Sequence, residues 1–155
     1  MSVVAGTVLQ TRRLHDLYRR RERLAERQEE ACAALPDWAM EPLRLVGMSS
    51  AEVTALVSDL SEREQEEGIA ELEMQMADID REIDGLEAQL ARTPSTSVEG
   101  IEAVLSLAVE QMRAFTVRDP SDVFYDHGEA RVLALVERAL TDARALLNTR
   151  TARAG

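Results

Sequence analysis

The feature that most constrains this chain is a heptad repeat over residues 69–90. Apolar side chains recur there at alternating spacings of three and four residues: Ile69, Leu72, Met76, Ile79, Ile83, Leu86 and Leu90. This spacing places all seven side chains on one stripe of an α-helix, as in helices that pack lengthwise against another helix. Since no segment alternates with the period of two that is typical of strands, we predict an all-α fold.

The predicted partner of this stripe is an N-terminal helix from about Val8 to Leu35. Thr7 and Gln10 have the spacing of a capping box at its start, and Pro36 disfavours helical backbone in the residue before it. Its stripe is apolar except at two positions and consists of Leu14, Leu17, Arg21, Leu24, Gln28, Ala31 and Leu35. Two such stripes joined by a short loop favour an antiparallel coiled-coil hairpin.

The loop between the two predicted helices, residues 36–49, is rich in apolar side chains. Pro36, Pro42 and Gly47 interrupt it, which argues against one continuous helix. We predict that this loop folds over the end of the hairpin and includes a short helical turn that starts at Pro42.

The second helix is predicted over residues 49–92, with Ser49 and Glu52 as a capping box. Gly68 lies where the apolar pattern changes phase, and a glycine within a helix costs about 1 kcal/mol. We predict one continuous helix with a weak point at Gly68, and a true break is the alternative. A continuous helix would outreach the first helix, so its stripe beyond about residue 78 would need cover from elsewhere.

The remainder of the chain is predicted to form a smaller helical hairpin. Residues 93–97 read Thr-Pro-Ser-Thr-Ser, which is typical of a linker, and amphipathic helices are predicted over 97–115 and about 126–147. We therefore predict two domains, a coiled-coil hairpin over 1–92 and a two-helix hairpin over 93–155.

Charged residues beside the two long stripes predict which helices pair. The g positions of the first helix are all arginine, namely Arg13, Arg20 and Arg27, and the e positions of the 69–90 stretch are all acidic, namely Glu73, Asp80 and Glu87. Residues at e and g flank the apolar seam and select the partner. Two copies of the acidic-edged helix would repel each other in a parallel pair, whereas the arginine-edged helix is complementary. Exposed ion pairs contribute only about 0–1 kcal/mol each, so apolar burial supplies most of the stability.

Composition narrows the compartment and the class of partner. The net charge is −11, which disfavours nucleic acid and anionic membranes as partners. The single cysteine, Cys32, fits a reducing compartment. No apolar run approaches the roughly 20 residues of a membrane-spanning helix. We expect a soluble, cytoplasmic protein.

Two charge clusters have a functional alternative. Arg19, Arg20, Arg21 and Arg23 would suit a nucleic-acid patch, but acidic residues are interleaved with them. The acidic run from Glu62 to Asp84 would suit imitation of a phosphate backbone, although a run of this kind is usually a solvated helix face.

A single dense cluster has the chemistry of a metal site: Asp122, Asp126, His127 and Glu129. Carboxylates with an imidazole can hold a hard or borderline cation. Asp126 and Glu129 are also explained as a capping box, and Asp122 as the cap of a short turn. With no glycine-rich phosphate loop, paired-cysteine spacing or nucleophile motif, we expect no catalytic residue, metal or cofactor.

The stretch from Ile83 to Leu105 carries a resemblance to known proteins. A heptad helix is followed by Ala-Arg-Thr-Pro at residues 91–94 and by a helix that opens Ser-Val-Glu-Gly-Ile at residues 97–101. This arrangement is similar to small uncharacterised helical proteins of alphaproteobacteria, some of them from prophage-like or mobile regions. The resemblance implies a family of coiled-coil proteins, some of them phage-associated, without an assigned activity.

These observations favour a non-catalytic interaction or assembly protein that acts through helix-to-helix contacts. Because the stripe beyond residue 78 would need cover, we expect a homo-oligomer with residues 79–90 in its interface. The alternative is an acidic inhibitor or nucleic-acid mimic that binds a basic partner protein. A third hypothesis is a small enzyme or metal protein at residues 122–129.

Overall fold

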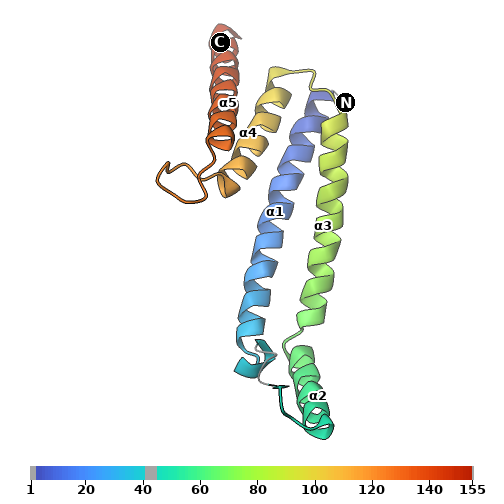
Figure 1. Cartoon of the computed structure of the whole chain (residues 1–155). Coiled ribbons are helices and arrows are strands. Elements are labelled where there is room, and N and C mark those ends of the chain that lie inside the picture. Colours follow the sequence, from blue (N-terminus) through green and yellow to red (C-terminus); the bar gives the residue numbers. More distant parts are fainter. Residues whose placement is uncertain (1–2, 41–44, 155) are drawn as a thin grey trace. The chain divides into compact units, whose positions relative to one another are not determined.

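The computed structural model describes residues 3–40 and 45–154, and within these ranges every regular element is helical. Five α-helices and one 3-10 helix follow one another along the described chain: α1 Val3–Ala33, η1 Asp37–Met40, α2 Ser50–Glu66, α3 Ile69–Arg92, α4 Val98–Phe115 and α5 His127–Ala154 (Figure 1). The predicted all-α fold, a coiled-coil hairpin followed by a smaller αα-hairpin, is confirmed. None of these described helices has the length and apolar character needed to cross a membrane.

Contacts divide the chain into two compact units. The hairpin unit comprises Leu17–Gly85, and the terminal unit comprises the residues up to Asp16 together with those from Leu86 onward. Both α1 and α3 contribute residues to each unit. The division into domains 1–92 and 93–155 follows the order of the chain, and it stays a prediction about independently folding parts.

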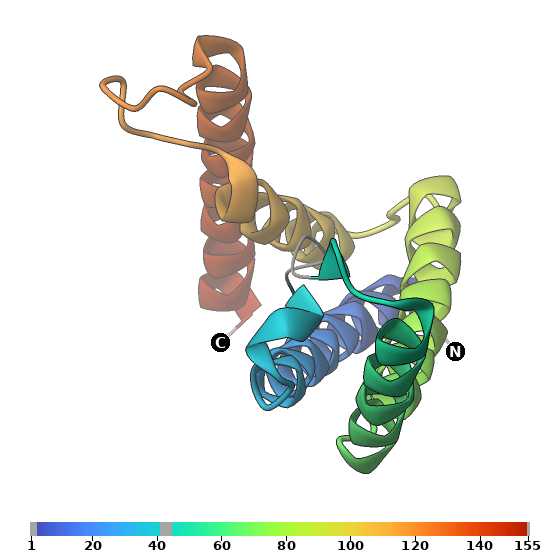
Figure 2. The same ribbon diagram turned by 60° about the horizontal axis from the view of Figure 1, so that its bottom comes forward.

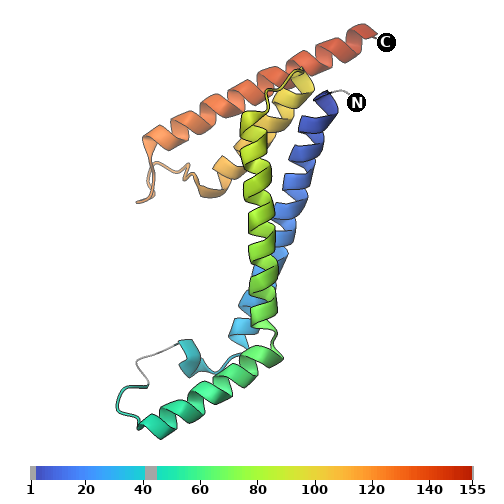
Figure 3. The same cartoon turned by 90° about the vertical axis from the view of Figure 1, so that its right-hand side faces the viewer.

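Within the hairpin unit, α1 and α3 lie side by side in opposite directions (Figures 1 and 3). Arg21 of α1 contacts Asp80 of α3, whereas Gln28, further along α1, contacts Glu73, which comes earlier in α3. The two predicted stripes form the buried seam of this pair. Its fully buried members are Leu17, Leu24, Ala31, Ile69, Leu72, Met76, Ile79 and Ile83.

The predicted continuous helix over 49–92 is wrong, because the chain breaks at Gly68. Gly68 has a φ of +68°, a left-handed conformation that glycine adopts without the steric cost of a Cβ atom. Its N–H donates to the Gln65 carbonyl, and its own carbonyl accepts from Leu72 as α3 begins. The phase change at this residue was therefore the signal of two helices, and α2 leaves the α1–α3 pair at an angle (Figure 3).

The loop before α2 is only partly covered. The 3-10 helix η1 brings Trp38 to a half-buried position, but Val46 and Met48 are exposed. The predicted helical turn from Pro42 starts outside the described residues.

The terminal unit contains the antiparallel pair of α4 and α5. Arg113 near the end of α4 pairs with Glu137 early in α5, and Glu102 near the start of α4 pairs with Arg144 late in α5. The buried apolar side chains of the two helices are Leu107, Val109, Leu133, Leu140 and Ala143. The loop between the helices projects away from both of them (Figures 1 and 2).

Two helix ends differ from the prediction. α1 starts at Val3 rather than Val8, and Thr7 is a buried residue inside it whose carbonyl accepts from the Thr11 hydroxyl at 2.8 Å. α5 continues to Ala154 rather than ending near Leu147. Neither glycine nor proline interrupts its last two turns, so nothing local stops the helix.

Candidate functional site

The predicted oligomer interface is largely occupied within one chain. Ile79 is 4% exposed and Ile83 is also buried, and both lie in the seam of α3. The break at Gly68 explains the difference from the prediction. It leaves α3 with 24 residues against the 31 of α1, so no part of the described α3 outreaches α1 as a 49–92 helix would have done. Leu86 and Leu90 are half-buried members of the terminal unit.

The acidic edge of α3 has different partners from those predicted. Asp80 accepts a hydrogen bond from Nε of Arg21 at 2.9 Å, and Glu73 accepts one from Gln28 at 3.4 Å. Arg21 and Gln28 are the polar a-position residues of α1, not its g-position arginines. In an antiparallel pair the e edge of one helix faces the e edge of the other, whereas the prediction matched e with g, which is the parallel arrangement.

The predicted g-position arginines lie on the exposed side of α1. Arg20 and Arg27 make no ion pair with any residue in the described part of the hairpin unit, and Arg13 belongs to the terminal unit. The third acidic residue of the predicted match, Glu87, accepts from the Gln111 side chain of α4 at 3.4 Å. The seam is therefore held by apolar burial with a polar bridge at Arg21, which also contacts the Met76 sulfur at 3.3 Å.

The carboxylates before α5 organise the backbone. Asp126 Oδ1 accepts from the Glu129 N–H at 2.9 Å, as a cap at the start of α5. Asp122 Oδ1 accepts from the Phe124 N–H at 2.8 Å, and Asp119 accepts from both the N–H and the hydroxyl of Ser121. The hydrogen bonds from Ser121 lower the pKa of Asp119. Among the described residues, no group of three or more His, Cys, Asp and Glu side chains is placed to hold a metal ion.

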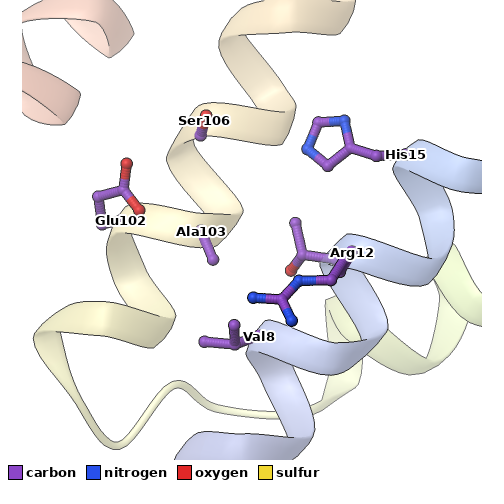
Figure 4. A pocket seen from close by; sticks show the side chains of 7 residues that line it. Val8, Arg12, His15, Glu102, Ala103 and Ser106 are labelled. Carbon is purple, nitrogen blue, oxygen red and sulfur yellow. The ribbon is translucent and has the colours of Figure 1, made fainter.

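A pocket of about 200 Å³ with mixed polar and apolar lining lies between the start of α1 and α4 (Figure 4). Arg12 and His15 line it from α1, and Glu102 and Ser106 line it from α4. Nδ1 of His15 lies 2.8 Å from a Glu110 carboxylate oxygen. Because Arg12 and Glu102 carry opposite charges on the same rim, the pocket does not select strongly for a cation or an anion. Sequence patterns did not reveal the pairing of His15, since its partner is on a different helix.

Helix α2 is the element with the least cover. Its N-terminus has the predicted capping box, in which the Glu52 N–H donates to the Ser49 hydroxyl and the Ser49 N–H donates to the Glu52 carboxylate. The backbone hydrogen bond from Ser49 lowers the pKa of Glu52. None of the 17 residues of α2 is buried, and Val57 in the middle of its apolar face is 53% exposed. The helix is well formed at its start, yet its apolar face is only partly covered: Val53, Leu56 and Leu60 are half-buried.

Glu137 of α5 links α5 to α4 and to the loop that follows α4. Its Oε1 accepts from Arg113 Nε at 2.8 Å and also from Arg118. These two hydrogen bonds, that of Arg113 first, lower the pKa of Glu137. Both arginines are more than half exposed, so solvent weakens the interaction.

The lowered pKa of Glu137 predicts a pH-dependent contribution to stability. A carboxylate with a depressed folded-state pKa stabilises the fold at neutral pH, and this contribution is lost as the pH falls through that pKa. We expect Glu137→Gln to lower the melting temperature by about 2 °C at neutral pH. The difference from the wild type should vanish in acid, as measured by circular dichroism across a pH series. A difference that stays constant down to the lowest pH would contradict the assignment to an ionised Glu137.

Comparison of this chain with protein-family models, with curated proteins and with solved structures finds no match. The similarity to alphaproteobacterial helical proteins therefore stays a prediction.

Proposed function

We propose that this protein is a non-catalytic helical interaction protein, with α2 as its docking helix. The observation that carries the proposal is that α2 buries none of its residues, although it has a defined apolar face made of Val53, Leu56, Val57 and Leu60. Each of the other four α-helices buries apolar side chains, so α2 alone lacks a place in a core.

The energetics of an isolated helix support this assignment. A helix of about this length is marginal in water unless its apolar face is packed. The capping box at Ser49 and Glu52 stabilises the first turn, but the apolar face is only partly packed: Val57 is 53% exposed and its three neighbours on the face are half-buried. Burial of a large aliphatic side chain contributes about 1.5–3 kcal/mol, so a partner that covers this face gains affinity from each residue.

The fitting partner is a helix with an apolar stripe. Such a helix would pack its stripe lengthwise against α2. The partner's contacting side chains would be spaced three and four residues apart. α2 carries five acidic residues against the single Arg63, so a partner helix either has basic flanks or is oriented so that like charges stay apart. A homo-oligomer, as expected from the sequence, requires an arrangement that keeps these acidic residues apart.

The proposal is tested with a fluorescent amphipathic peptide that has a leucine heptad stripe and arginines on both flanks. We expect micromolar binding, measured by fluorescence anisotropy, and a dissociation constant raised about tenfold or more by Leu56→Asp. Ser58→Asp is the matched control, since it adds the same charge to the opposite side of α2. Because Leu56 is half-buried whereas Ser58 is exposed, the melting temperature of each variant is measured beside its affinity, and binding is compared at a temperature where both variants are folded. Equal binding of the peptide by wild type and Leu56→Asp would refute a docking role for α2.

A second candidate function, an acidic inhibitor of a basic partner, is favoured by the end of α2. Glu62, Glu64 and Glu66 are exposed and form no ion pair with a described residue. An arginine peptide without leucines separates the two functions. If acidity alone recruits the partner, this peptide binds as tightly as the leucine-containing one, and moderate salt abolishes both complexes. If the apolar face recruits the partner, only the leucine-containing peptide binds.

A further inference from the structure

The apolar face of α2 is symmetric about the midpoint between two adjacent residues. Its four aliphatic side chains are separated by three, one and three positions, so the pattern reads the same in both directions: Val53, Leu56, Val57 and Leu60. We propose that the partner of α2 is α2 of a second copy of this chain, paired antiparallel about the point between Leu56 and Val57. This inference rests on the proposed function of α2 as the docking helix.

In the antiparallel register, each apolar side chain of α2 lies opposite an apolar side chain of the second copy. Val53 of each copy lies opposite Leu60 of the second copy, and Leu56 lies opposite Val57. A two-fold contact of this kind uses the same patch on both molecules and closes on itself, which gives a dimer rather than a filament. The pairing covers Val57, whose side chain is 53% exposed in the single chain.

The charge distribution along α2 selects the antiparallel direction. Glu62, Glu64 and Glu66 all lie in the C-terminal part of the helix, where Arg63 is already paired with Asp59. A parallel pair would set these carboxylates side by side, which is repulsive. In the antiparallel pair they lie beside the first turn of α2 of the second copy, and the N-terminal end of a helix dipole favours negative charge.

The small area of the α2–α2 contact limits the affinity of the dimer. A helix of 17 residues is about 25 Å long, and the apolar face covers only its middle. One such helix pair buries less than a standard protein interface, so the dimer is weak and reversible. The expected dissociation constant is about 10–100 µM, and the fraction of dimer rises over the corresponding protein concentrations.

Sedimentation velocity over a concentration series tests the proposal on the full chain. The wild type should pass from monomer to dimer, and Leu56→Asp should raise the dissociation constant about tenfold or more. Ser58→Asp should dimerise like the wild type. Dimerisation that survives Leu56→Asp would place the contact elsewhere, for instance on the exposed side of α5 with Val132 and Leu135, and would overturn the inference.

Disulfide crosslinking tests the direction of the pair, in a Cys32→Ala background. Val57→Cys is close to the two-fold axis and should form a crosslinked dimer under mild oxidation. Val53→Cys should not, because in the antiparallel register the two copies of position 53 are seven residues apart along the axis, about 10 Å, beyond the reach of a disulfide. Equal crosslinking at both positions indicates a parallel pair and overturns the proposed register.

The two proposals fail in different ways. A protein that stays monomeric throughout the series, yet binds the arginine-flanked peptide in a Leu56-dependent manner, overturns the self-pairing and leaves the docking role intact. A monomeric protein that binds no peptide at α2 overturns both.

Discussion

Ile79→Asp is expected to lower the melting temperature by about 10–20 °C or to leave the chain unfolded. Ile79 is 4% exposed in the seam between α1 and α3, and the nearby cation Arg21 is already paired with Asp80. A buried carboxylate without a partner costs several kcal/mol. In a chain of this size each kcal/mol shifts the melting temperature by about 2–4 °C. Circular dichroism melting measures the effect, and Ile83→Asp should behave in the same way.

The matched control for this change is Met74→Asp. Met74 lies on the same helix, α3, but is 55% exposed, so the same charge there stays in water. We expect its melting curve to follow that of the wild type closely. If Ile79→Asp melted like Met74→Asp, the heptad stripe of α3 would not be a buried seam.

The second large effect is expected in the terminal unit, at Leu133 of α5. This residue is 2% exposed, whereas Leu135, two positions further along the same helix, is 63% exposed. Leu133→Ala removes a buried side chain and leaves a cavity, which should lower the free energy of unfolding by about 2–5 kcal/mol. Leu135→Ala should change it by no more than about 0.5 kcal/mol.

Urea denaturation compares the two leucine variants directly. The midpoint for Leu133→Ala should fall well below that of the wild type with a similar slope, and the midpoint for Leu135→Ala should hardly move. Equal losses at the two positions would mean that α5 packs through a different face. A loss at Leu135 alone would mean that its exposed side is covered by another molecule in solution.

The sequence by itself determined that the fold is all-helical and which faces of α1 and α3 are buried. The spacing of Leu17 and Leu24 in α1, and of Ile69 to Ile83 in α3, predicted the two sides of the seam because side-chain periodicity is a local property of an α-helix. Capping was equally local. The capping box at Ser49 and the Asp126 cap of α5 were predicted because a cap needs only a side-chain oxygen three residues before an unpaired N–H, whereas the box predicted at Thr7 is absent because α1 already runs through that residue.

Only the tertiary structure decided which helix packs against each apolar face. The phase change at Gly68 was compatible with a weak point or with a true break, and the left-handed backbone there separates α2 from α3. With this break, the α3 stripe lies against α1, whereas no residue of α2 is buried. The partners of His15 and Asp80 were likewise out of reach of the sequence. Periodicity reports which side chains share one face of a helix, but the direction and register of the neighbouring helix decide what that face contacts.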